Sequence, residues 1–155
     1  MHLVAIVLLI LTQGFTLRAE PSRSPTPQRD LPRAILSLGT NSLTTQIAAD
    51  DASRERGLMS RTNLGDDEGM VFVFPQPRPV TFWMKDTPTP LSIAYISPSG
   101  RILEIHDMKA FDEAPVPSDS QAILYALEAA KGWFTRHGIL PGDVVGGLPS
   151  ATSAK

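Results

Sequence analysis

The chain has 155 residues, of which 42% are hydrophobic and 19% charged, with a formal net charge of −2 and no cysteine. This length suits one domain rather than two, and the apolar fraction argues against disorder of the whole chain. The near-neutral charge argues against non-specific nucleic-acid binding, which depends on many unopposed Lys and Arg, and the absence of cysteine excludes disulfides, thiol nucleophiles and cysteine-based metal sites.

An apolar run at residues 3–11 opens the sequence. It is shorter than the about 20 residues that a transmembrane helix needs, and its length is typical of the apolar region of a secretory signal. Ala19 follows as a small residue for cleavage. We therefore predict a signal peptide at residues 1–19 and a periplasmic or extracellular location, with membrane contact only through this segment. An uncleaved anchor is the alternative.

Prolines interleaved with Ser, Thr, Arg and Gln follow the apolar run. Because proline fixes φ and removes a backbone donor, residues 20–33 are predicted to form a Pro-rich linker, a solvated tether. A single globular domain is expected over residues 34–148. The small and polar residues 149–155 are predicted to be a flexible tail.

The first predicted elements of the domain are a hairpin and a helix. Residues 35–38 and 43–48 flank a turn and are expected to pair as strands. Asp50 or Asp51 is expected to cap the helix by accepting hydrogen bonds from its unpaired first-turn donors. At spacings of i, i+4 and i+7, one face of this helix would carry Arg54, Leu58 and Arg61.

Dense apolar segments predict the remaining strands at residues 71–74, 80–84, 91–95, 102–105 and 144–145. Prolines 75, 77 and 79 are expected to enforce a loop after the first of these. A short helix is predicted over residues 131–137, ending at Gly138. Strands at this spacing with short turns favour a meander or small barrel.

The segment at residues 121–128 is ambiguous from its own pattern. Its Ala, Leu and Glu favour a helix. The alternation of Ile123, Tyr125 and Leu127 is instead typical of a strand. Periodicity alone leaves both possibilities open.

Several motifs occur in a fixed order: Arg-Glu-Arg-Gly-Leu-Met-Ser-Arg at residues 54–61, Gly-Met-Val-Phe-Val-Phe at 69–74, Phe-Trp-Met-Lys-Asp-Thr at 82–87 with Pro-Leu at 90–91, Leu-Glu at 127–128 and Gly-Asp at 142–143. Together they resemble the domain of unknown function 192 family over about residues 43–146. The resemblance implies a compact α+β domain of mostly antiparallel strands with two short helices, often behind an export signal. It also implies a strand at residues 121–128. The family's activity is not established.

Two positions depart from the pattern that this resemblance implies. Asp86 stands where the family usually has Asn, and Ser92 stands where it usually has Asp. A family function that depended on these two positions acting together would be altered in this chain.

Residues 82–85 suggest a binding groove. Side chains alternate along a strand, so Trp83 and Lys85 would share one face. Trp83 would form an aromatic floor for a sugar ring, a flat ligand or a peptide, and nearby cations would suit a carboxylate or phosphate. The alternative is core packing, in which case Trp83→Ala would cost about 3–5 kcal/mol. The predicted binding residues, all within the motifs, are Arg54, Met59, Arg61, Met70, Trp83, Met84, Lys85 and Asp86.

No catalytic residue, metal or cofactor is predicted. Glu104 and His106 could share a strand face, but a catalytic zinc normally needs three protein ligands. The leading hypothesis is an exported, monomeric domain that binds a small ligand or cell-envelope component without catalysis and without nucleic acid. The alternatives are an envelope-associated hydrolase using a carboxylate such as Asp86, and a protein-interaction module anchored by Trp83.

Overall fold

The computed structural model describes residues 25–153, and the predicted signal peptide lies outside them. The elements in chain order are β1 (Arg33–Leu38), β2 (Asn41–Ala48), α1 (Asp51–Arg56), β3 (Glu68–Arg78), β4 (Thr81–Phe82), β5 (Leu91–Ile96), β6 (Ile102–Met108), β7 (Val116–Pro117), β8 (Ile123–Ala130), α2 (Trp133–Arg136), β9 (Val145–Gly146) and the 3-10 helix η1 (Ala151–Ser153). No helix within this described part has the length and apolar character needed to cross a membrane.

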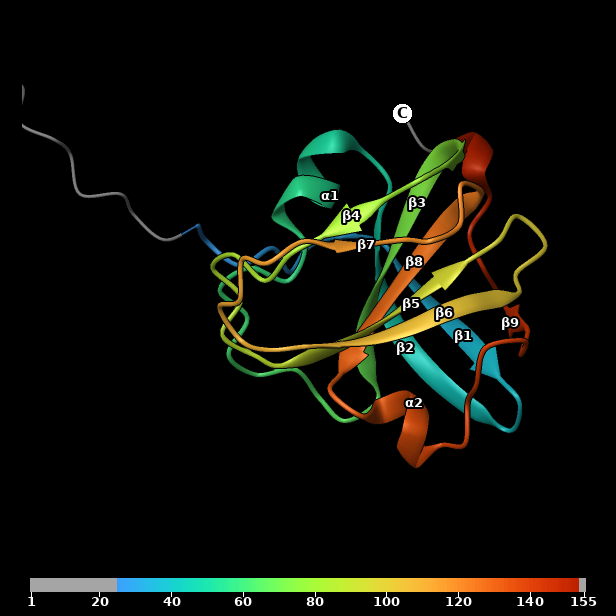
Figure 1. Ribbon diagram of the computed structural model, residues 1–155. Helices are drawn as coiled ribbons and strands as arrows, with labels where there is room; N and C mark the ends of the chain where they lie inside the picture. The colour runs from blue at the N-terminus through green and yellow to red at the C-terminus, as the bar shows by residue number, and fades with distance from the viewer. Residues whose placement is uncertain (1–24, 154–155) are drawn as a thin grey trace, which may run out of the picture.

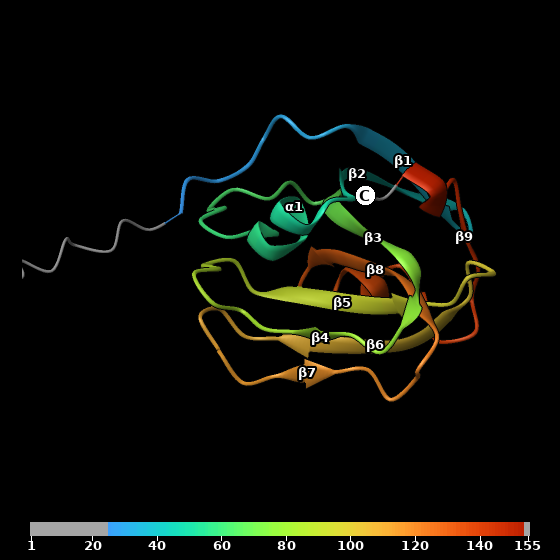
Figure 2. The same cartoon turned by 90° about the horizontal axis from the view of Figure 1, so that it is seen from above.

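Seven strands form one curled sheet in the order β6-β5-β8-β3-β2-β1-β9, and β4 pairs with β7 in a separate ribbon (Figure 1). The predicted α+β class with two short helices is confirmed. The expectation of mostly antiparallel pairing needs one correction, because β2 and β3 run parallel. A parallel pair needs a crossover connection, and the chain makes this crossover through α1. Figure 2 shows the sheet curling as a half-barrel, with α1 and the β4–β7 ribbon beside it.

The predicted hairpin and helix cap are both confirmed. β1 pairs with β2 in antiparallel register. The Asp50 side chain accepts a hydrogen bond from the Ser53 amide at 2.9 Å, and the Ser53 hydroxyl accepts one from the Asp50 amide at 3.2 Å. However, α1 ends at Arg56 because Gly57 leaves the helix with a φ of 46°. The predicted helical face of Arg54, Leu58 and Arg61 therefore does not form.

The prolines after residue 74 do not end β3 as predicted. The strand continues to Arg78, with a register shift between Val73 and Arg78. The proline stretch is exposed and irregular, so missing backbone donors are tolerated there. The strand predicted at residues 80–84 is shorter and comprises only β4. The segment that was ambiguous from its own pattern is a strand, β8, as the family resemblance implied.

Alternation along β3 divides the apolar core into two clusters. Val71 and Val73 face the cluster that contains Trp133 of α2. Met70 and Phe72 face the other cluster, which includes Leu58 just after α1 and Met84 just after β4. The two helices therefore cover different faces of the sheet, and any site beneath α1 belongs to the second cluster.

The described part of the predicted linker packs on the domain. The Gln28 side-chain amide donates to the carbonyl oxygens of Ser53 at 2.8 Å and Gly57 at 2.9 Å. Leu31 packs against the second core cluster. Gln28 and Leu31, both within the predicted linker, therefore contact the domain. In the predicted tail, Ala151 likewise packs against the first core cluster.

Candidate functional site

A pocket of about 450 Å³ lies between α1, β3 and residues 79–83, and we refer to it as the α1–β4 pocket. This volume is within the range of small-molecule sites. Its apolar lining includes four aromatic residues, Phe72, Phe74, Phe82 and Trp83. Such a wall suits a ligand with an apolar or flat portion.

Glu128 of β8 lines this pocket from the sheet, and it is only 4% exposed. It lies opposite Met70 of β3 on one side and Ile93 of β5 on the other. Burial raises the pKa of Glu128 from 4.5 to about 8, since no described residue supplies a hydrogen bond or countercharge that would lower it. The carboxyl group is therefore mostly protonated at neutral pH and is free to interact with a ligand.

Aromatic rings lie two residues along the sheet from Glu128, whose direct neighbours on β3 and β5 are Met70 and Ile93. Phe72 and Tyr95 both lie opposite Ala126, which is two residues from Glu128 and on the same face of β8. Phe82 joins the two rings, with its centroid 4.9 Å from that of Phe72 and 5.9 Å from that of Tyr95. The Tyr95 hydroxyl donates to the carbonyl oxygen of Val116, so it does not satisfy the carboxyl group.

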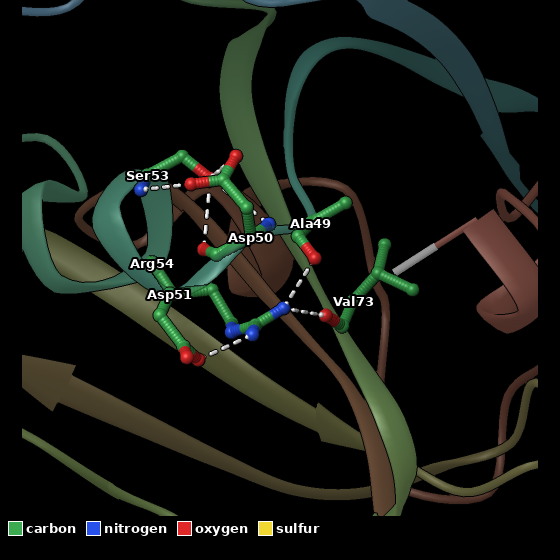
Figure 3. A network of polar contacts seen from close by, with 6 residues as sticks. All are labelled: Ala49, Asp50, Asp51, Ser53, Arg54 and Val73. Atoms are coloured by element: carbon green, nitrogen blue, oxygen red, sulfur yellow. Dashed lines mark hydrogen bonds and ion pairs between the residues drawn. The ribbon is translucent and has the colours of Figure 1, made fainter. Parts of the chain in front are cut away.

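Arg54 lines the pocket, but its donors are engaged within the protein (Figure 3). Its guanidinium donates to the carbonyl oxygens of Ala49 and Val73, and to the Asp51 carboxylate at 2.7 Å. The side chain is 11% exposed, and the guanidinium lies 5.9 Å from the centroid of Phe74. These contacts connect α1 with β3 and leave few donors for a ligand.

Arg61 is directed to a different part of the molecule. It is buried, donates to the Gln46 side-chain oxygen at 2.6 Å, and lies 3.5 Å from the Glu68 carboxylate. Burial lowers the pKa of Arg61, and Glu68 counteracts part of this effect. The structure therefore does not bring Arg61 to Trp83, as the predicted groove required.

Trp83 lies at the surface, with 47% exposure, and the Lys85 ammonium is 5.3 Å from its ring centroid. Trp83 and Met59 line both the α1–β4 pocket and a neighbouring hollow. Lys85 and Asp86 line only that neighbouring hollow.

The other two predicted methionines, Met70 and Met84, are buried in the second core cluster. The structure thus assembles Arg54, Met59 and Trp83 at the pocket, and Lys85 and Asp86 beside it. Whether these residues bind a ligand stays a prediction.

Ser92 and Asp86, the two departures from the family pattern, have separate surroundings. The Ser92 hydroxyl contacts the Asp107 carboxylate at 2.5 Å and accepts from the Gly132 amide at 2.8 Å. Asp86 instead lies at the neighbouring hollow, where its carbonyl oxygen accepts from the Ser60 amide at 2.7 Å. The described contacts of Ser92 therefore do not include Asp86.

His106 is half-buried on β6. Its ring nitrogen lies 3.1 Å from the Glu104 carboxylate, which also accepts the amides of Asp119 and Ser120. These hydrogen bonds outweigh burial and lower the pKa of Glu104. Across residues 25–153, no group of three or more His, Asp or Glu is arranged to hold a metal ion.

Glu128 is not among the binding residues predicted from the sequence. One feature of the sequence does point to Glu128, which is the single acidic residue in the otherwise apolar segment at residues 123–130. Once that segment is assigned as a central strand, its carboxylate must face one of the two core clusters.

Comparisons with known proteins agree with this fold. A model of the family described as "Uncharacterized ACR", domain of unknown function 192, matches residues 34–147. No curated protein matches the chain. A crystal structure from Sinorhizobium meliloti 1021, described as a candidate transcription regulator, is 35% identical with a TM-score of 0.74, covering 77% of this chain and 97% of that one.

A second similar structure is a protein of unknown function from Novosphingobium aromaticivorans DSM 12444. It is 31% identical with a TM-score of 0.67, and the match covers 80% of this chain and 93% of that one. The family match spans nearly the whole described domain, including β8 with Glu128. The chain belongs to the domain of unknown function 192 family.

Proposed function

We propose that this chain is an exported, monomeric domain that binds a small ligand or a cell-envelope component in the α1–β4 pocket without catalysing a reaction. The observation that carries this proposal is the buried Glu128 carboxyl group, which faces an aromatic-walled pocket of about 450 Å³ without a partner among the described residues. A buried polar group without a partner is costly, and a ligand would supply that partner. Export is proposed from the sequence pattern of residues 1–19.

The non-catalytic part of the proposal is supported by the surroundings of Glu128. A hydrolase of the two-carboxylate type needs a second acid facing the first across the cleft. Of the other acidic residues that line the pocket, Asp51 pairs with Arg54 and Glu55 is exposed at the rim. Neither supplies a second buried acid.

Acid–base catalysis is a second candidate function, because a pKa of about 8 is close to neutral pH. Glu128 supports it better than Asp86, which lies at the neighbouring hollow. An activity screen separates the two: turnover lost in Glu128→Gln and kept in Asp86→Asn would favour catalysis at Glu128.

A protein-interaction role anchored by Trp83 is the remaining alternative, and the exposure of Trp83 favours it. Nucleic acid is not the ligand that we propose, because a net charge of −2 gives little attraction to phosphates. The description of the S. meliloti relative is therefore not extended to this chain.

The two tryptophans of the sequence offer a direct test of the pocket. Trp83 lines it, whereas Trp133 is fully buried in the other core cluster and its indole N–H donates to Asp67 at 3.0 Å. In an NMR screen of the full chain against saccharides, nucleotides, amines and anions, a bound ligand should shift the Trp83 indole signal and leave that of Trp133 in place. If no compound in the screen shifts the Trp83 signal, the proposed function is wrong.

A further inference from the structure

We infer that the α1–β4 pocket selects a ligand with an organic ammonium group, seated against the Glu128 carboxylate and the aromatic rings beside it. This inference rests on the proposed ligand-binding function and adds the chemical class of the ligand. It follows from three features of the pocket: its unmatched acid, the distribution of charge around it, and its aromatic lining.

The unmatched acid is Glu128. It is 4% exposed, and the described residues provide it with neither a cation nor a hydrogen-bond donor. An ionised carboxylate in such a position needs a countercharge, whereas a bound anion would place two negative charges together. A cation is therefore the ligand charge that would stabilise the ionised form of Glu128, which is the minor form in the free protein at neutral pH.

The charges elsewhere in the pocket balance one another. At the rim, exposed Asp51 and Glu55 accompany exposed Arg56 and Arg78. Arg54 lies deeper, but its guanidinium is held by two carbonyl oxygens and Asp51. Among the residues that line the pocket, Glu128 is thus the one buried ionisable residue that receives no countercharge from another described residue.

Aromatic rings provide the second half of an ammonium site. The faces of aromatic rings attract cations, and aromatic cages are a common way to bind quaternary ammonium groups. Phe72 and Phe82 line the pocket with ring centroids 4.9 Å apart, and Phe72 lies opposite Ala126, two residues from Glu128. Tyr95 is buried outside the lining and supports Phe82, with its ring centroid 5.9 Å away. Trp83 adds a ring at the pocket wall.

Proton linkage makes the inference testable. A permanent cation binds the ionised form of Glu128, so its binding should release a proton and tighten as the pH rises through about 8. A neutral ligand that accepts a hydrogen bond from the protonated carboxyl group should bind less tightly as the pH rises.

Other charged or titratable groups also face this region. They are Asp51, Arg54, Glu55 and Arg56 beside the pocket from α1, Arg78 from β3, Tyr95 from β5, and Glu104 with His106 behind Tyr95 on β6.

The experiment uses calorimetric titration of the full chain with choline, and with dimethylbutanol, its neutral isostere in which carbon replaces nitrogen. We expect choline to bind at least about tenfold more tightly near pH 9 than near pH 6, because the ionised fraction of Glu128 rises over that range. Dimethylbutanol should bind more weakly and without this increase. In Glu128→Gln, choline binding should weaken and lose its pH dependence. His106→Gln is the matched control, since His106 lies behind Tyr95, and in this variant the pH dependence of choline binding should persist.

Each contrary outcome has a distinct meaning. If dimethylbutanol binds as well as choline, or if inorganic phosphate displaces choline from the pocket, the ammonium assignment is wrong while ligand binding stands. If choline binding does not change with pH in the unmodified chain, Glu128 is not its partner, whether or not Glu128→Gln folds. If neither probe nor any compound of the NMR screen shifts the Trp83 signal, the proposed function fails as well.

Discussion

The guanidinium of Arg54 donates a hydrogen bond to the backbone carbonyl oxygen of Val73 at 2.8 Å, which connects the helix above the pocket to the strand at its wall. The same group also satisfies the carbonyl oxygen of Ala49. The arginine that the sequence marked as a candidate ligand contact thus has a role in holding the pocket together.

Removing Arg54 should therefore lower stability. Arg54→Ala removes the guanidinium that donates to the carbonyl oxygens of Ala49 and Val73, and hydrogen bonds to a charged group are worth about 1.5–3 kcal/mol. We expect the free energy of unfolding in urea to fall by about that amount. Arg56→Ala is the matched control, since Arg56 is exposed on the same helix and should change stability by less than about 0.5 kcal/mol. Equal effects of the two substitutions would contradict the role of Arg54.

The two tryptophans should respond very differently to truncation. Trp133 has no exposed surface, so Trp133→Ala should cost about 3–5 kcal/mol. Trp83 is 47% exposed, so Trp83→Ala should cost less than about 1 kcal/mol, well below the value expected for a core tryptophan. Chemical denaturation of both variants checks this, and a large loss in Trp83→Ala would show that the indole packs more deeply than we describe.

The burial of Glu128 should make the protein less stable as the pH rises. A folded-state pKa of about 8 against an ordinary 4.5 means that the folded state holds an extra proton between these values. The free energy of unfolding should therefore decline across this window, by up to roughly 5 kcal/mol, and level off above it. Asp50 and Glu104 have lowered pKa values, so their contributions are lost only under more acidic conditions.

Comparison with Glu128→Gln isolates this effect from other titrating groups. Urea denaturation between about pH 5 and pH 9 should give a flatter profile for the variant, which becomes more stable than the unmodified chain at the alkaline end. Parallel profiles for the two proteins would show that Glu128 titrates normally.

Gly69 allows β3 to approach β8 next to Glu128. A Cβ atom at residue 69 would lie 2.3 Å from the Glu128 carbonyl oxygen, which belongs to the backbone and cannot easily move. Gly69→Ala should therefore destabilise the fold by about 1–3 kcal/mol or more. Gly65→Ala is the control, because its nearest neighbour would be the half-buried side chain of Glu68 at 3.1 Å. Similar melting temperatures for the two variants would contradict this account.

Much of the local structure could be predicted from the sequence. The hairpin, the Asp50 cap and the strand at residues 71–74 all depend on signals within a few neighbouring residues. The parallel pairing of β2 with β3 could not be predicted this way, because it depends on how the crossover through α1 returns the chain to the sheet. The exposed prolines of β3 wrongly predicted a loop, because a proline is tolerated in a strand where the hydrogen-bond ladder is already irregular.

The site was predictable only in part. Trp83, Met59 and Arg54 line the α1–β4 pocket, and their binding of a ligand stays a prediction. Arg61 does not line the pocket, because the spacing argument assumed a helix that in fact ends at Gly57. Glu128 was missed because the spacing of apolar residues in its segment fitted neither a helix nor a strand decisively. The surroundings of its carboxyl group also depend on strands β3 and β5, which are distant in sequence.

The most direct test of this account is to follow the side-chain carboxyl carbon of Glu128 by NMR during a pH titration, with its signal assigned through Glu128→Gln. We expect a titration midpoint of about 8 in the free protein and a lower midpoint when choline is present in excess. A midpoint close to 4.5 that choline leaves unchanged would contradict it.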